Sequence, residues 1–297
     1  MAWLMESERG WVLIWPAVSD LQAALVCAVA CAVLGWFAPR LIARLPEPEP
    51  PEETPAPGDT PEDDQKTERD AELVTGEGLG HRPEHQPEHQ EDRKAFARTL
   101  PPPPPKELYS DIAALPHLGL KVGAWSALIG GLFGLVLGWT GALVYLVPLV
   151  PIGVVLLVID WRTTLLPTRI IHPTYVLLAV LIPLAALLDQ DLDALYRAGF
   201  GWLVVGGWFW IFWWLLKAWG FGDVRLARVL GPALGFLGWE HMLMGLALMV
   251  FIGGLGGAVL AVANRSVRKR FPYGPFMLVG AAAAVVAGPW LAAGLGY

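Results

Sequence analysis

The sequence GALVYLVPLVPIGVVLLVID occupies residues 141–160 and carries no charge before its last residue, Asp160. At 1.5 Å per residue, these 20 residues form a helix about 30 Å long, which matches the hydrocarbon thickness of a bilayer. A second long apolar run, residues 201–219, is followed directly by the tetrapeptide GFGD, which ends at Asp223. Because a carboxylate at membrane depth is costly, both aspartates are candidates for a functional site.

The composition of the chain supports a membrane location. Hydrophobic residues make up 55% of the 297 residues, charged residues make up 16%, and the mean hydropathy is +0.49. This is too apolar for an ordinary soluble domain and indicates several membrane spans. The net charge of -6 comes mostly from one acidic segment, residues 47–92. No basic region with interleaved aromatic residues is present, so we expect no nucleic-acid partner.

The hydropathy pattern predicts an all-α, polytopic membrane helix bundle of about eight transmembrane helices. The first span lacks a basic region before it, so we interpret it as a retained span and not as a cleaved signal peptide. The span predicted for residues 226–239 is short and contains Gly231-Pro232, so a tilted or re-entrant helix is expected there. The predicted spans are residues 21–41, 119–139, 141–160, 171–188, 198–218, 226–239, 242–263 and 275–295.

Three regions follow from the changes in composition. Residues 1–45 contain an N-terminal transmembrane helix, residues 46–117 form an acidic Pro-rich linker, and residues 118–297 form a membrane-embedded domain. Residues 46–106 hold almost no large apolar side chains, so they cannot offset their ordering entropy and are predicted to be disordered. We interpret the linker as a solvated tether, with electrostatic attraction of a basic partner as the weaker alternative.

The distribution of basic residues orients the chain in the membrane. Alternating the eight spans brings the basic residues after spans one, three, five and seven to one side, while Asp189, Asp191, Asp193 and Glu240 fall on the other. By the positive-inside rule, the basic side is cytoplasmic. The two aspartates at the span ends then lie at the same depth on the cytoplasmic side.

Two carboxyl groups at one depth can form a pair that shares a proton, as in aspartic proteases. Each residue alone also has a plainer interpretation. Asp160 can be a charge that reaches the headgroups from the end of a span. Asp223 can be a helix N-cap or the ion-pair partner of Arg225.

The two acidic motifs together resemble the type IV prepilin peptidase family of membrane aspartic proteases. The first is Asp-x-Arg-Thr-x-x-x-Pro from Asp160, and the second is Gly-x-Gly-Asp-Val-Arg-Leu from Gly220. A Pro-aromatic-Gly-Pro-aromatic segment from Pro272 opens the last span, as in the family. The resemblance covers residue 118 to the C-terminus and implies that Asp160 and Asp223 are catalytic. The residues that it implies as supporting the motifs are Gly220, Gly222, Arg225, Pro167, Pro272, Gly274 and Pro275.

The resemblance also implies a substrate and a location. The family removes the basic leader peptide of type IV prepilins or pilin-like secretion proteins at the cytoplasmic face of the inner membrane. The expected partners are therefore a prepilin or pseudopilin and membrane lipid, with no cofactor. Arg225 stands where the family usually has lysine, which keeps the charge but changes the donor geometry.

One part of the family pattern is missing from this sequence. Bifunctional members carry two Cys-x-x-Cys pairs that bind zinc in a cytoplasmic domain after the first span, associated with methylation of the new N-terminus. Residues 46–117 contain no cysteine, and the chain has only Cys27 and Cys31, which we interpret as packing residues. Two thiols do not supply the four ligands of a structural zinc site. We expect neither zinc nor methyltransferase activity.

The sequence is also compatible with other interpretations. An ion- or proton-coupled transporter can also use acids in broken helices, although its sites lie near the midplane of the membrane. Presenilin-type proteases share the Gly-x-Gly-Asp motif, but the tripeptide at 232–234 follows Asp223 too closely to match their Pro-Ala-Leu. The histidines at 81, 85 and 89 belong to a Pro-containing low-complexity repeat, and His172 is interpreted as an interfacial residue.

Overall fold

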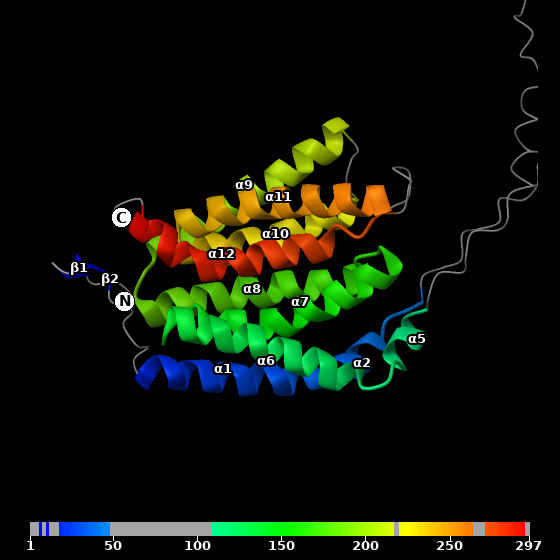
Figure 1. The fold of residues 1–297 in the computed structure, drawn as a ribbon, viewed down its shortest axis with the longest axis horizontal. Coiled ribbons are helices and arrows are strands. Elements are labelled where there is room, and N and C mark those ends of the chain that lie inside the picture. Colours follow the sequence, from blue (N-terminus) through cyan, green and yellow to red (C-terminus); the bar gives the residue numbers. More distant parts are fainter. Residues whose placement is uncertain are drawn as a thin grey trace, which may run out of the picture. The chain divides into compact units, whose positions relative to one another are not determined.

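The computed structural model describes residues 6–7, 10–11, 18–47, 108–216, 220–263 and 271–294. Within these residues, eight long helices, each corresponding to one predicted span, lie roughly alongside one another (Figure 1). They are α1 (Val18–Trp36), α6 (Leu118–Leu137), α7 (Leu143–Thr163), α8 (Thr168–Asp189), α9 (Asp193–Leu216), α10 (Phe221–Leu237), α11 (Trp239–Ala263) and α12 (Gly274–Gly294). The described part of the chain also contains the short helices α2 (Ala38–Ile42) and α5 (Tyr109–Ala113) and the antiparallel two-residue strands β1 (Glu6–Ser7) and β2 (Gly10–Trp11).

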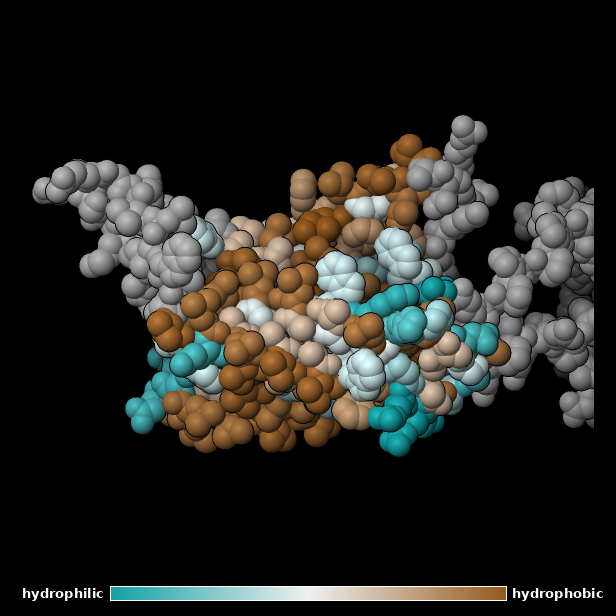
Figure 2. All heavy atoms as spheres, turned by 60° about the horizontal axis from the view of Figure 1, so that its bottom comes forward, coloured by the Kyte–Doolittle hydropathy of each residue, from teal (hydrophilic) through white to brown (hydrophobic). Residues whose placement is uncertain are grey.

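The predicted membrane bundle is confirmed by the length and composition of these helices. Among the described residues, six helices are long and apolar enough to cross a membrane, namely α1, α6, α7, α8, α9 and α11, and α12 adds a shorter apolar segment, Gly274–Gly288. α10 has 17 residues, in agreement with the short run expected there. Figure 2 shows apolar side chains over the middle of one face and hydrophilic side chains toward its ends. The chain is a multi-pass membrane protein.

The first predicted span, residues 21–41, is divided into α1 and α2 at Phe37. Pro39 causes this break because it has no N–H for an i−4 hydrogen bond and its ring clashes with the carbonyl of the preceding turn. The Phe37 N–H instead bonds the Leu34 carbonyl at 3.2 Å, which closes α1 in a tighter turn.

α5 lies near the end of the predicted linker, where the sequence pattern gave no helix. Its buried residues Tyr109 and Ile112 are three positions apart and share one face, which packs against α2. The rest of the predicted linker, over residues 48–107, lies outside the described residues, as do its histidines at 81, 85 and 89.

Glycines let α6 approach α1 closely. A Cβ atom at Gly134 would lie 2.6 Å from the carbonyl oxygen of Ala23, and one at Gly123 would lie 3.0 Å from that of Ala32. Small residues at such contacts allow the backbones of membrane helices to pack directly against each other. This packing holds the first helix against the rest of the bundle.

Gly134→Ala is therefore expected to destabilise the protein by about 1–3 kcal/mol, because the added methyl group has no room against the α1 backbone. The measurement is the Tm of the detergent-purified protein. Gly207→Ala on α9 is the matched control, since nothing lies within 4 Å of its added Cβ. Equal Tm values for the two variants would contradict this account of the α1–α6 contact.

The end of the bundle opposite Asp160 is held by polar contacts to the backbone. The Asp189 carboxylate accepts the Gly141 N–H at 2.6 Å, just before α7 begins. The Tyr145 hydroxyl donates to the Ala233 carbonyl at 2.8 Å and so ties α7 to α10 inside the core. These contacts fix the position of α7 along the bundle relative to α8 and α10.

Candidate active site

Asp160 lies in the last turn of α7, with only 4% of its surface exposed. The helix ends three residues later, at Thr163, because Thr164 takes a left-handed conformation with a φ of 53°. The Gly274 N–H, at the start of α12, donates to Oδ2 of Asp160 at 2.9 Å. The third motif of the sequence, which opens the last span, is thereby bonded to the first aspartate.

Asp223 lies in the first turn of α10, with 7% of its surface exposed. Gly220 is the N-cap residue, and its N–H donates to Oδ2 of Asp223 at 3.0 Å. The glycine-rich tetrapeptide is thus the junction at which α10 begins. One plainer interpretation holds in part, because Asp223 does accept a bond that caps the helix.

Both carboxylates lie at helix N-termini, Asp160 at that of α12 and Asp223 at that of α10. The free N–H groups and the positive end of the helix dipole there stabilise a negative charge, each worth roughly 0.3–1 kcal/mol at exposed sites and up to about 2 kcal/mol in partly buried ones. Burial acts in the opposite direction, since it disfavours the charged form. The site can therefore hold one ionised acid more readily than two.

Asp160 and Asp223 lie within electrostatic range of each other. The side chain of Leu166, from the turn after α7, connects the segments around them. A Cβ at Gly222 would lie 3.1 Å from Cβ of Leu166, and one at Gly274 would lie 3.5 Å from its Cδ1. Leu166 therefore fills the space between the Gly-Phe-Gly-Asp turn and the start of α12. Its position inside the first motif was the only signal for this residue in the sequence.

Tyr273 is a second neighbour that was not singled out from the sequence. Its ring is buried, its hydroxyl donates to the Met249 carbonyl at 3.1 Å, and Asp223 lies within electrostatic range. Burial, together with the nearby charge of Asp223, raises the pKa of the Tyr273 phenol, which keeps it neutral. Its place between two supporting residues of the third motif was the available signal.

Arg225 does not pair with an aspartate, which rules out that interpretation of Asp223 within the described residues. Its guanidinium donates to the Thr168 hydroxyl at 2.6 Å and lies 4.8 Å from the centroid of the Phe221 ring. The Tyr175 hydroxyl donates to the Arg225 carbonyl at 2.8 Å. These hydrogen bonds of Arg225 hold the first turn of α10 against α8.

The remaining supporting residues shape the backbone around the acids. Pro167 is the extended N-cap residue of α8 and ends the turn that follows Asp160. Pro272 precedes α12, and Pro275 is buried in its first turn, where a proline removes no helical hydrogen bond. Gly222 lies against Leu166, as described above.

Several other candidates lie away from this site. His172 stacks on Tyr175, with ring centroids 6.0 Å apart, and Cys27 and Cys31 are buried in α1. The Cys31 thiol donates to the Val147 carbonyl at 3.4 Å, which agrees with a packing role. No group of three or more metal-binding side chains occurs among the described residues.

Two neighbouring buried carboxyl groups can share one proton, so that one accepts a proton while the other donates one. That arrangement suits the addition of water to a carbonyl group.

Comparison with known proteins also indicates a peptidase. Residues 147–262, which contain both aspartates, match the type IV leader peptidase family. No curated protein and no solved structure matches the chain. The segment that carries Asp160 and Asp223 is thus similar to the type IV leader peptidase family.

Proposed function

We propose that this protein is an aspartic endopeptidase that removes the basic leader of type IV prepilins or pilin-like secretion proteins. The observation that carries the proposal is the pair of buried aspartates, each held by the N–H of a different helix start, inside a peptidase family segment. The family match favours a peptidase over the ion- or proton-coupled transporter.

In the proposed reaction, the ionised member of the pair acts as general base and takes a proton from a water molecule. The resulting hydroxide attacks the scissile carbonyl, and the neutral member donates its proton to the developing oxyanion. The tetrahedral intermediate then collapses with proton transfer to the leaving amine. The N–H donors from Gly220 and Gly274 stabilise whichever carboxylate is ionised.

The site is proposed to lie at the cytoplasmic face of the inner membrane. The C-terminal end of α7 and the N-terminal ends of α10 and α12 lie at the same end of the bundle (Figure 1). That end of the bundle carries the basic residues Arg162 and Arg169, and the opposite end carries Asp189 and Asp191. A substrate with a cytoplasmic basic leader and an apolar membrane helix would present its junction at this depth.

Methylation of the new N-terminus is not part of the proposed function. A zinc domain of the bifunctional type needs cysteines, and the only two in the chain are Cys27 and Cys31, within α1 and buried. Residues 46–117 therefore cannot supply the thiolate ligands of such a domain.

The proposal is tested by co-expressing the protein with each prepilin-like protein encoded in the same genome. We expect at least one of them to lose its leader, with N-terminal sequencing placing the cut on the cytoplasmic side of the apolar segment. Mass spectrometry of the product should find an unmethylated N-terminal amine. Retention of the leader on every candidate would refute the peptidase assignment for these substrates, and a methylated product would refute the restriction to peptidase activity.

A further inference from the structure

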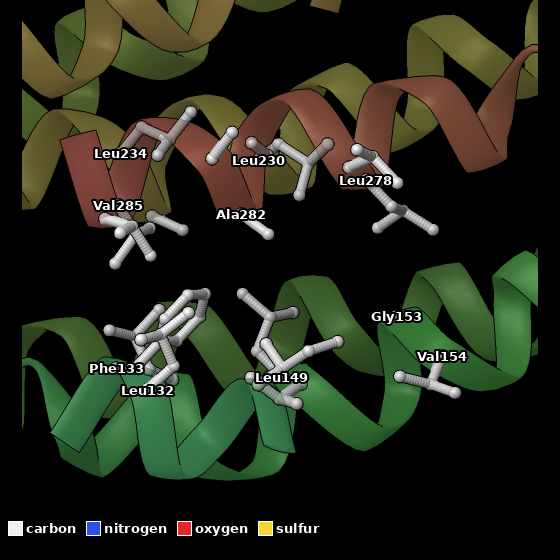
Figure 3. A pocket seen from close by; sticks show the side chains of 18 of the residues that line it. Leu132, Phe133, Leu149, Gly153, Val154, Leu230, Leu234, Leu278, Ala282 and Val285 are labelled. Atoms are coloured by element: carbon white, nitrogen blue, oxygen red, sulfur yellow. The ribbon is translucent and has the colours of Figure 1, made fainter. Parts of the chain in front are cut away.

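An apolar cavity of about 490 Å³ lies between α6, α7, α10 and α12. Figure 3 shows side chains of α6 and α7 facing those of α10 and α12 across the space. All the residues that line it are apolar, and none belongs to the aspartate pair. The mechanism proposed above gives this cavity no role.

The cavity-facing side of α7 leads directly to Asp160. The lining residues Leu146, Leu149, Gly153 and Leu157 are followed at the same helical spacing by Asp160, with steps of three, four, four and three residues. Residues at these spacings share one face of a helix. Asp160 is thus the next residue on the face that lines the cavity.

The walls formed by α10 and α12 lead to the same place. On α10, the lining residues Leu230 and Leu234 share a face with Asp223, which lies seven positions before Leu230. On α12, Leu278 is four positions after Gly274, the residue that donates to the Asp160 carboxylate. On each of these three helices, residues that line the cavity therefore share a helix face with a residue of the aspartate site. In this sense three walls of the cavity converge on the aspartate pair.

The cavity also borders the lipid-facing surface. Leu132 on α6 and Val279 on α12 line it and are 41% and 50% exposed. On α7 the lining residues run from Leu146 to Leu157, which is about 17 Å of helix at 1.5 Å per residue. This length matches a helix of about eleven residues. A helix with its side chains is about 10–12 Å across, so the space suits one face of such a helix, with the other face in lipid.

We propose that this cavity receives the apolar helix of the substrate and so places the bond to be cleaved at the aspartate pair. The inference rests on the proposed function and deepens it. A substrate helix bound in the cavity would hold its scissile carbonyl in a fixed position relative to the two acids, so that the reaction would no longer depend on a random encounter in the membrane. A lipid acyl chain would fit the apolar walls equally well, but it would not require the three walls to converge on Asp160, Asp223 and Gly274.

Filling the cavity tests the proposal. Ala282→Trp places an indole in it, and Ala258→Trp, at an exposed position on α11, is the matched control. Two substrates are compared: a complete membrane-embedded prepilin, and a soluble peptide that spans only the cleavage junction. We expect Ala282→Trp to lower the ratio of prepilin to peptide turnover at least about tenfold, and Ala258→Trp to leave it unchanged. An unchanged ratio in the Ala282 variant would overturn the inference.

Cross-linking gives an independent test that does not require the tryptophan variant to fold. Val279→Cys and Val286→Cys line the cavity at different depths, and Val259→Cys, exposed on α11, is the control. Each cysteine is introduced into a peptidase variant in which both aspartates are changed to asparagine. It is then tested for oxidative disulfide formation with each of a series of single cysteines in the apolar segment of the prepilin. The two cavity positions are seven residues apart on α12, so their strongest partners in the substrate should also be about seven residues apart.

The outcomes separate the two proposals. Absence of any cross-link at Val279 and Val286, or cross-links of equal strength at Val259, would overturn the cavity inference; a cavity that holds only acyl chains gives this result. Cleavage of both substrates by the unchanged protein with no effect of Ala282→Trp would leave the peptidase proposal intact. Failure to cleave either substrate would overturn both proposals.

Discussion

Replacing either Asp160 or Asp223 by asparagine is expected to lower the rate of leader cleavage at least about a thousandfold. An amide has nearly the size of a carboxyl group but neither accepts nor releases a proton at neutral pH. Its oxygen can still accept the N–H of Gly274 or Gly220, so the local backbone should be kept. The change therefore removes the proton chemistry while leaving the fold in place.

The measurement is the fraction of a co-expressed prepilin that loses its leader, normalised to the amount of peptidase in the membrane. Asp193→Asn is the matched control, because this exposed acid lies in the first turn of α9 at the other end of the bundle. It should process the prepilin at the unchanged rate. Wild-type cleavage by either variant at 160 or 223 would disprove the assignment of the pair. Loss of the protein from the membrane would instead indicate a structural role.

Gly274→Ala is expected to lower the cleavage rate on the order of a hundredfold without loss of stability. The added Cβ would lie 2.8 Å from Oδ2 of Asp160 and 3.3 Å from its Cγ, so the carboxyl group must move from its present position. A displacement of this kind costs much more in catalysis than in packing, because the acid has to stay aligned with both water and substrate.

The test compares turnover with thermal stability in the same preparation. Gly254→Ala on α11 is the control, since an added Cβ there meets nothing within 4 Å. We expect Gly274→Ala to change kcat more than KM, because the added methyl group contacts the Asp160 carboxyl group and not the cavity. Full activity at 274 would mean that the carboxylate can move freely and that the Gly274 N–H has no positioning role.

The sequence alone predicted eight spans, and each has a helix in the structure. It did so because apolar length and charge are local properties, which decide membrane insertion before any helix packs against another. The break at Phe37 was missed because the apolar run continues across Pro39 without a change in hydropathy. The short helix α5 was missed because it depends on burial against α2.

The sequence also predicted Asp160 and Asp223 as the candidate site and placed them at a common depth, since each ends or follows an apolar run of known length. Only the tertiary structure decided which groups surround them. The Gly274 donor, the Leu166 contact and the proximity of Tyr273 depend on how three helices distant in sequence meet at one end. The convergence of the cavity walls on the pair depends on the rotation of α7, α10 and α12 about their axes. Helix rotation is set by packing between side chains of different spans, which neither the hydropathy nor the charge of a single span contains.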